Sequence, residues 1–424
     1  MAILIGTDRV LLSKVIGQGG AATVYEHPLY RDQCVKIHND ADKVEAERIR
    51  FLIANPPPQL VVRGIPLYAW PRAAAYDEQS GALVGFSMAR LHKVLPVQAI
   101  IDPSSCSSAI TREWRWKVAI SIAELVHTLH LMNPPHIMGD VNLENFLVHR
   151  DARVTAIDMD STHFTIPGVK TFLCDRHRPE MQPPELVSAT TPVVERDQDQ
   201  DAFSVFILVH RLLREGIHPF DAIYSGSSTS LRLHERIEQG IWPDSLLYTD
   251  YRPKAGTIPF TSLPTDIQDL NRRMFLDGIT DRSKRPNVTE LLTSLQLHQP
   301  LRSRYARINR YAWRRELHPN PKPYSRFQRS VEFCRAHIHK AALLALFGVA
   351  IAARSLPSDE NDGPMRPTKP LLRHPDTLSR SVAPVIKPPT TYNQVLPKPP
   401  EPSQSTRPLL ETPRLWRLAE ESGE

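Results

Sequence analysis

The sequence predicts an α+β protein in which a strand-rich first part precedes a helix-rich second part. Residues 9–38 alternate apolar and polar positions around a glycine cluster, which is typical of strands joined by a tight turn. Apolar residues then recur at helical spacing from Trp114 to Leu129, and residues 202–213 are apolar on nearly every side. The second part is therefore predicted to contain an amphipathic helix and a buried one.

Shorter elements complete this order. A helical pattern over residues 41–54 is stopped by three consecutive prolines at 56–58, and residues 83–91 are predicted to form another strand. Two apolar runs, at 145–148 and 154–157, are separated by a polar turn. This spacing indicates a β-hairpin that follows the amphipathic helix.

The composition is that of a globular protein, with 41% hydrophobic and 23% charged residues in a chain of 424. This length suffices for one large or two medium cores. The four cysteines lie far apart without a CxxC pair, which argues against a zinc site and a disulfide framework and favours a reducing compartment. The apolar start is short and contains Asp8, so no signal peptide is expected and the predicted location is cytoplasmic.

The net charge of +6 is concentrated after the predicted domain. Residues 301–340 contain eleven Lys and Arg against two Glu, with aromatic residues interleaved, so the rest of the chain is slightly acidic. Contact with nucleic acid and contact with an anionic membrane surface are two hypotheses for this basic aromatic linker. A solvated linker that contains a helix is the third hypothesis, and the plainest.

Two further segments follow the linker. Residues 341–353 carry no charge, but a membrane span takes about 20 apolar residues. We therefore favour a buried or partner-facing helix over membrane association for this segment. From residue 355 to 424 the chain has 14 prolines and no hydrophobic period, which predicts a disordered tail. Within it, residues 397–402 are a candidate ligand for a peptide-recognition partner, although a plain spacer has the same composition.

A glycine cluster and a lysine lie on the first predicted strands. Residues 17–24 read GQGGAATV, and glycines allow a backbone to approach phosphate groups closely, although an ordinary hairpin has the same pattern. Lys36 lies between apolar neighbours, where an unpaired ammonium group is costly. Phosphate oxygens and a carboxylate from the next helix would pair with it. Glu45 and Glu47 are the candidates, and a solvated helix face is the alternative for either.

The most specific pattern lies around the predicted hairpin. Residues 139–148 read GDVNLENFLV, and residues 156–160 read AIDMD. Phosphoryl transfer depends mainly on positioned charge. Asn145 and Asp158 supply the hard oxygen ligands that such a metal ion requires, and Asp140 is suited to orienting an acceptor hydroxyl group.

These motifs resemble the eukaryotic-like protein kinase family over residues 8–298, and in particular a bacterial branch with GDxNxxN and DxDS loops. The resemblance implies a bilobal fold, with a small β-rich lobe over about 8–91 and a larger helical lobe over about 92–298. It implies an ATP-dependent kinase that phosphorylates Ser or Thr of protein substrates. A pseudokinase or nucleotide-sensing scaffold is the alternative, and a small-molecule kinase is a third possibility.

The resemblance also implies roles for single residues. Lys36 would hold the α- and β-phosphates of ATP, Asp140 would be the catalytic base, and Asn142 would orient the γ-phosphate. The expected Mg²⁺ ligands are Asn145 and Asp158. The residues expected around the nucleotide, including a hinge-like segment at 88–91, are Gly17, Gly19, Gly20, Ala22, Val24, Lys36, Glu47, Met88 and Arg90.

Other family features are structural, and some positions depart from the family. Glu185 is expected to pair with Arg285, and Asp201 is expected to begin the buried helix. Asp160 replaces the last glycine of the metal loop, and Ala22 replaces the third glycine of the phosphate loop. These departures leave the choice between Ser/Thr and Tyr open.

Gly139 replaces the arginine that precedes the catalytic aspartate in the family, and this replacement predicts how activity responds to phosphorylation. Without that cation, a phosphorylated activation segment has no partner at this position. We therefore expect phosphatase treatment to leave most of the activity in an assay with labelled ATP. A dephosphorylated protein that is inert and recovers on loop phosphorylation would contradict this expectation.

Overall fold

The described residues all lie within one compact unit of the chain, Met1–Cys334. The computed structural model describes residues 1–41, 44–102, 106, 108–176, 178–187, 195–254, 258–299, 308 and 310–317. The basic aromatic linker predicted at 301–340 falls mostly outside these residues. The predicted segments 341–353 and 355–424 fall wholly outside them.

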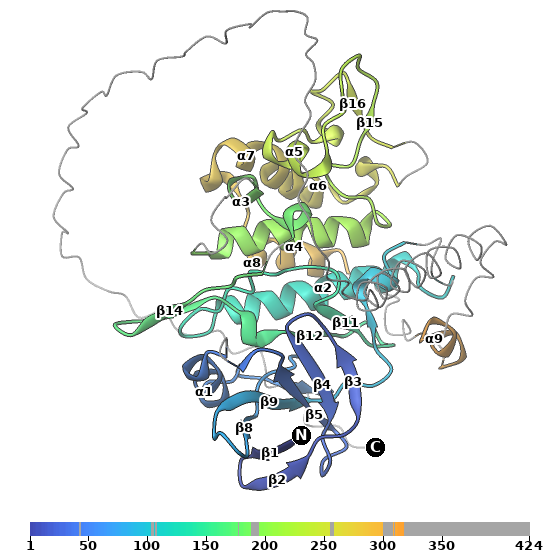
Figure 1. Cartoon of the computed structure of the whole chain (residues 1–424). Coiled ribbons are helices and arrows are strands. Elements are labelled where there is room, and N and C mark those ends of the chain that lie inside the picture. Colours follow the sequence, from blue (N-terminus) through green and yellow to red (C-terminus); the bar gives the residue numbers. More distant parts are fainter. Residues whose placement is uncertain are drawn as a thin grey trace, which may run out of the picture. The chain divides into compact units, whose positions relative to one another are not determined.

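A seven-stranded antiparallel sheet forms the first part of the chain, with the strand order β2-β1-β8-β9-β5-β4-β3 (Figure 1). The strands predicted within 9–38 and 83–91 are confirmed, and the sheet begins ahead of the predicted start at residue 8. Its strands are β1 Ala2–Ile5, β2 Asp8–Leu11, β3 Val15–Gln18, β4 Ala22–Glu26, β5 Gln33–His38, β8 Ala73–Asp77 and β9 Leu83–Ala89.

The two faces of the sheet bury different clusters, and this alternation sets the direction of Lys36. Val35 and Ile37 belong to a cluster on one face. Because side chains alternate along a strand, Lys36 points to the other face, where its ammonium lies 5.8 Å from the centre of the Phe86 ring. Helix α1, Ala46–Ala54, covers this face and packs Ile49 against Phe86. A helix was predicted over 41–54, and it starts later than expected.

The second part of the chain is helical and is built on α2, Arg112–His130, which contacts α4, Gln198–Leu213, and α8, Val288–Leu297 (Figure 1). These helices confirm the amphipathic and buried helices of the sequence analysis, and their buried faces form one large core. The other described helices are α3 Pro184–Val187, α5 Leu233–Glu238, α6 Thr265–Arg272, α7 Gly278–Thr280 and α9 Arg310–Leu317, with a π-helical turn at Arg273–Asp277.

Side-chain caps fix where the large helices begin. The Thr111 hydroxyl accepts a hydrogen bond from the backbone of Trp114 at the start of α2. Capping boxes start α4 at Asp197 and α8 at Asn287. Single 3₁₀ turns lie between the larger elements, at Val97–Ala99, Met159–Ser161, Pro179–Met181, Pro243–Ser245, Phe260–Ser262 and Arg282–Lys284.

The predicted hairpin is confirmed as β11, Phe146–Val148, and β12, Val154–Ala156, which pair antiparallel. Beyond the paired residues, the backbone N–H of Ile157 donates to the carbonyl of Asn145 at 2.9 Å. The hairpin thus brings the end of one predicted motif beside the start of the next. The remaining short strands are β6 Val61–Val62, β7 Ile65–Pro66, β10 Leu95–Pro96, β13 Phe164–Ile166, β14 Lys170–Phe172, β15 Ile223–Tyr224 and β16 Tyr251–Arg252.

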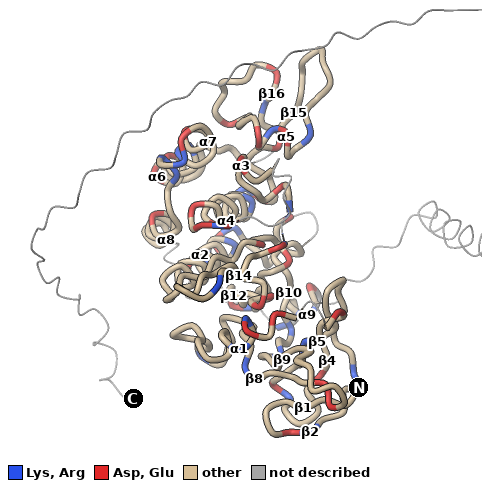
Figure 2. Tube along the Cα trace, turned by 60° about the vertical axis from the view of Figure 1, so that its left-hand side comes forward, with Lys and Arg blue, Asp and Glu red and all other residues tan. Residues whose placement is uncertain are grey.

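Charges of both signs are distributed over the described residues (Figure 2). Basic and acidic residues are interspersed along the trace, as Figure 2 shows in blue and red. Within the described ranges, no helix combines the length and the apolar character that a membrane crossing requires. Cys34, Cys106 and Cys174 are free thiols.

His136 is a buried titratable group that links stability to pH. Its ring is 0% exposed and lies against the rings of Phe164, at 4.4 Å between centroids, and Trp70, at 5.5 Å. Burial lowers the pKa of His136 to about 4. The folded protein therefore keeps this ring neutral over a pH range in which the unfolded chain binds a proton.

We expect the free energy of unfolding to fall as the pH drops below about 6.5, the ordinary pKa of histidine. Between that value and about 4 the unfolded state binds more protons, so His136 alone removes up to ~1.4 kcal/mol per pH unit. Urea unfolding of His136→Phe at pH 7.5 and 5 should show a smaller loss than the wild type. His92→Phe, at an exposed position, is the control, and equal losses in all three proteins would refute the assignment.

Candidate functional site

Lys36 is a buried cation held by two carboxylates. Its ammonium donates to Oδ1 of Asp160 at 2.7 Å and to Oδ1 of Asp158 at 3.0 Å. Burial alone would lower the pKa of Lys36, but the two carboxylates outweigh burial and raise the pKa above its ordinary value. Lys36 is therefore charged at neutral pH.

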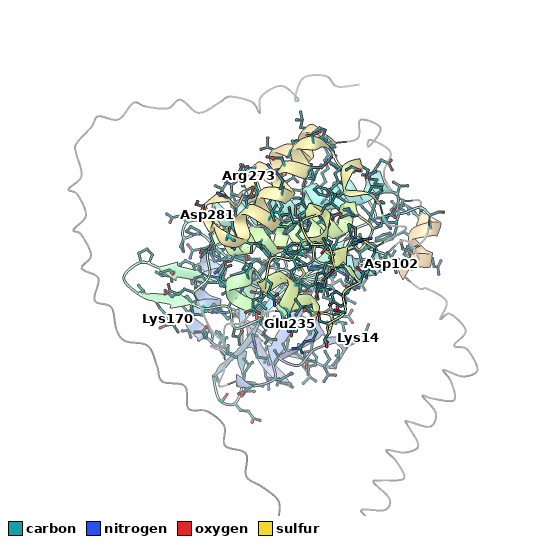
Figure 3. The ribbon with its side chains drawn as sticks, turned by 90° about the horizontal axis from the view of Figure 1, so that it is seen from above. Lys14, Asp102, Lys170, Glu235, Arg273 and Asp281 are labelled. Carbon is teal, nitrogen blue, oxygen red and sulfur yellow. The ribbon has the colours of Figure 1, made fainter. Side chains whose placement is uncertain are left out.

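The helix after Lys36 does not supply its carboxylate. Glu47 is exposed, and Glu45 pairs with Arg48 at 3.0 Å and with Lys170 at 2.9 Å. Lys170 is the first residue of β14 and is labelled in Figure 3. The prediction that Glu45 or Glu47 pairs with Lys36 is therefore wrong, because the carboxylate of Glu45, the N-cap residue of α1, is used by Arg48 and Lys170, and Glu47 lies on the exposed side of the helix.

Helix α1 presents a cation, Arg48, at the site, where a carboxylate was predicted. Its side chain is buried and donates to the backbone carbonyl of Asp160 at 3.1 Å and to that of Leu173 at 2.7 Å. The carboxylate comes instead from the side chain of Asp160, the position that differs from the family's glycine. Burial would raise the pKa of Asp160, but Lys36 outweighs burial and lowers it. In the sequence, this pair was indicated by the additional carboxylate of Asp160, at a position where the resembled family has glycine.

The loop from Asp140 to Asn145 is closed by its own amide groups. The Asn145 amide donates to the backbone carbonyl of Asp140 at 2.9 Å and to its Oδ2 at 3.0 Å. Asn142 is 2% exposed, and its Oδ1 accepts the backbone N–H groups of Glu144 and Asn145. Its Nδ2 donates to the carbonyl of Asp140 at 3.3 Å. Asn142 therefore stabilises the loop, which differs from the expected contact with a γ-phosphate.

Asp201 anchors this loop from the first turn of α4, although the N-cap of this helix is Asp197 and not Asp201 as predicted. Its carboxylate accepts the backbone N–H groups of Met138 at 2.5 Å and Gly139 at 2.7 Å, and it lies 3.2 Å from Nε2 of His130. The predicted pair of Glu185 and Arg285 is also confirmed, as a bidentate contact at 2.7 and 2.8 Å.

Asn145 and Asp158 offer oxygens that suit a magnesium ion. Oδ1 of Asn145 and Oδ2 of Asp158 have no hydrogen-bond partner among the described residues. The side chain of Asp158 is 49% exposed on a left-handed backbone, with φ 59°. No group of three or more His, Cys, Asp or Glu side chains forms a self-sufficient metal site in this part of the chain. This donor set fits Mg²⁺, which usually takes one or two protein oxygens and completes its shell with water and phosphate.

The glycine loop between β3 and β4 is held by a side chain from β5's end. Asn39 donates to the carbonyls of Gly19 at 3.1 Å and Gly20 at 3.0 Å. A Cβ atom on Gly20 would meet nothing within 4 Å, so the fold itself does not require glycine there. Three other predicted positions lie on the strands. Gly17 on β3 is opposite Val24 on β4, and Ala22 on β4 is buried.

A cleft of about 910 Å³ lies beside this loop. It is bordered by Gly20, His38, Arg48, Asp160 and Arg176, and its volume is in the range of small-molecule sites. Gly20 is the one residue of the predicted nucleotide set in its lining. The cleft is therefore lined by the glycine loop, by Asp160 and by the start of α1, while Lys36, Asp140, Asn145 and Asp158 are not among its lining residues.

The two hinge-like residues face different neighbours. Met88 is half-buried and packs with Ile49 and Phe86, on the same face of the sheet as Lys36. The guanidinium group of Arg90 pairs with Glu26 on β4. The structure therefore brings Met88, but not the side chain of Arg90, toward the face that carries the site.

An arginine that the sequence analysis missed lies beside Gly139. Arg196 is buried and donates to the carbonyl of Gly139 at 3.1 Å and to Oε1 of Gln182 at 2.7 Å. It reaches the loop from a distant point of the chain, so no local pattern indicated it. A cation thus lies next to Asp140 although the preceding residue carries none.

Similarity to known proteins supports a kinase-like class for this chain. No family model matches the sequence. The chain is 26% identical over 274 residues to the protein kinase YegI of Escherichia coli strain K12, which covers 63% of this chain and 41% of that relative. It is also 26% identical over 290 residues to protein kinase YegI of Escherichia coli O157:H7, covering 66% and 44%. The chain thus spans less than half the length of these curated relatives.

Gly139 is predicted to tolerate no side chain. Its φ is +71°, and a Cβ atom there would lie 2.7 Å from Cβ of Cys174 and 3.1 Å from Cδ of Arg196. We expect Gly139→Ala to lower the free energy of unfolding by more than about 2 kcal/mol, since backbone strain and a steric clash add.

Gly168→Ala is the matched control, because Gly168 has φ +73° and open space around its Cβ position. It should cost only the backbone part, about 1 kcal/mol. Urea unfolding measures both variants, and an equal loss in the two would show that the Cys174 contact does not matter.

Proposed function

We propose that this chain is an ATP-dependent protein kinase that transfers a phosphoryl group to Ser or Thr hydroxyl groups of protein substrates. The observation that carries the proposal is the contact of Lys36 with Asp158 next to the joined pair Asp140 and Asn145. The similarity to proteins named protein kinase supports it. Bound Mg-ATP would supply the transferable group and neutralise its charge.

Lys36 is suited to hold phosphate oxygens without losing its partners. An ammonium group has three N–H donors, and two of them are used by Asp160 and Asp158. The third is left for a phosphate oxygen. Asp160 keeps the side chain in place, so Asp158 is free to turn its exposed oxygen to Mg²⁺ together with Asn145. The glycine loop would cover the phosphates.

Asp140 is suited to accept the proton of the substrate hydroxyl group. One of its oxygens accepts the Asn145 amide, which fixes the plane of the carboxylate, and the other has no partner among the described residues. A fixed carboxylate with one unused oxygen meets the geometric need of a general base. The bidentate pair of Glu185 with Arg285 supports a protein substrate, since it anchors the segment that would receive a peptide.

A pseudokinase or nucleotide-sensing scaffold is the second candidate. The observation that favours it is the position of Asn142, whose amide is used inside the loop and adds no charge at the γ-phosphate. Retention of Lys36, Asp140, Asn145 and Asp158 favours the enzyme. A catalytic assay separates the two.

We expect autophosphorylation with labelled ATP and Mg²⁺ in the wild type. Lys36→Ala and Asp140→Ala should each reduce it more than about 100-fold, because each removes a charged group at the reacting phosphate. Asp160→Asn should weaken ATP binding about tenfold, because Lys36 loses the charge-assisted hydrogen bond that holds its side chain in place. Autophosphorylation of Glu47→Gln should stay within about twofold of the wild type, since Glu47 is exposed and Lys36 has other partners.

The controls decide between enzyme and scaffold. Equal labelling in all variants would indicate a contaminating kinase, and labelling in none would favour the scaffold. A thermal shift with ATP then separates a nucleotide sensor from a protein that binds no nucleotide. A large loss in Glu47→Gln with no loss in Asp160→Asn would overturn the assignment of Asp160.

A further inference from the structure

A second cavity lies where helix α9 meets the catalytic unit. It has a volume of about 810 Å³ and is lined by α9, by the loop after β9 and by the turn between β11 and β12. We call it the α9 pocket. It shares no lining residue with the cleft beside Lys36.

Four permanent cations line the α9 pocket, namely Lys93, Arg150, Arg310 and Arg314. The single carboxylate in the lining belongs to Asp151, which Arg153 binds at 2.6 and 3.0 Å. In the part of the chain that the structure describes, no carboxylate lies within 4 Å of Lys93, Arg310 or Arg314. Lys93, Arg310 and Arg314 therefore have no carboxylate partner among the described residues, whereas over the rest of the unit the two signs are interspersed (Figure 2).

The pocket is held together by contacts of the segment that carries α9. Trp313 is 3% exposed, its indole N–H donates to the backbone carbonyl of Lys93 at 2.8 Å, and its ring lies 6.0 Å from that of Trp114. The backbone N–H of Ile308, a buried residue, donates to the carbonyl of Arg150 at 3.2 Å. These bonds fix the backbones of two residues whose side chains line the pocket.

Two further observations concern the residues of the α9 pocket. Lys93 has a left-handed backbone, with φ 55°, a conformation that costs energy for a residue with a side chain and often marks a functional position. Residues 310–317 were expected to belong to a solvated linker or to a nucleic-acid or lipid surface. The structure instead buries Trp313 against the catalytic unit, so this aromatic residue is not available to bases or lipids.

The chemistry of the pocket indicates its ligand. Neighbouring cations repel each other, and an anion placed among them removes that repulsion. The planar guanidinium groups of Arg310 and Arg314 match phosphate oxygens in pairs, and the cavity has the size of a small-molecule site. Trp313 and Leu317 add an apolar wall. We propose that the α9 pocket binds a small soluble organic phosphate, independently of the catalytic site.

Isothermal titration of the full chain with inorganic pyrophosphate, without Mg²⁺, tests the phosphate part of this proposal. We expect binding in the wild type and at least about tenfold weaker binding in the double variant Arg310→Ala/Arg314→Ala, since each arginine contributes a charge-assisted hydrogen bond. Lys93→Ala, outside α9, should weaken binding as well. Lys36→Ala should bind like the wild type, so the result does not depend on the proposed kinase activity.

A matched control comes from the same basic stretch of the sequence. Arg326→Ala/Arg329→Ala removes the same charge outside the described residues and should leave binding unchanged. Equal weakening in both double variants would overturn the pocket in favour of diffuse charge. Loss of binding in Lys36→Ala would place the phosphate at the catalytic site. Binding to vesicles that contain phosphatidylinositol phosphates, without binding of pyrophosphate, would exclude a soluble ligand.

Discussion

The contact between Lys36 on β5 and Asp160 after β12 is the constraint on which the site depends. Both side chains are buried, and a buried charge costs several kcal/mol unless an opposite charge accompanies it. Each partner therefore holds the other in place. Because one belongs to the sheet and the other to the helical part, the pair also fixes how these two parts approach each other.

Arg48 extends this arrangement to helix α1 by a different kind of bond. The helix reaches the site through the backbone carbonyls of Asp160 and Leu173, and not through a carboxylate of its own. A displacement of α1 would break these bonds but would leave Lys36 with both of its acidic partners. Lys36 is therefore compensated by the two aspartates, and α1 contacts the backbone of the loop that carries them.

The sequence predicted those features that depend on local periodicity or on motif spacing. The strands, the hairpin at β11 and β12, the two large helices and the pair of Glu185 with Arg285 belong to this group. The pairing of Lys36 with Asp160 was missed, because the turn after β12, and not the helix after Lys36, brings this carboxylate to the ammonium group. Which residue of α1 faces the site was also open, because successive helical residues differ by about 100° in direction. Arg196 and Trp313 were missed for another reason, since tertiary contacts between distant segments place them.

Gly139 occupies a position that has no room for an arginine side chain. A change to arginine there would meet Cys174 and Arg196 at once, and would also place a side chain on a left-handed backbone. An arginine at this position would therefore require Cys174 and Arg196 to move or to change as well. The buried cation beside this loop therefore comes from Arg196, through its bond to the carbonyl of Gly139, and not from the residue before Asp140.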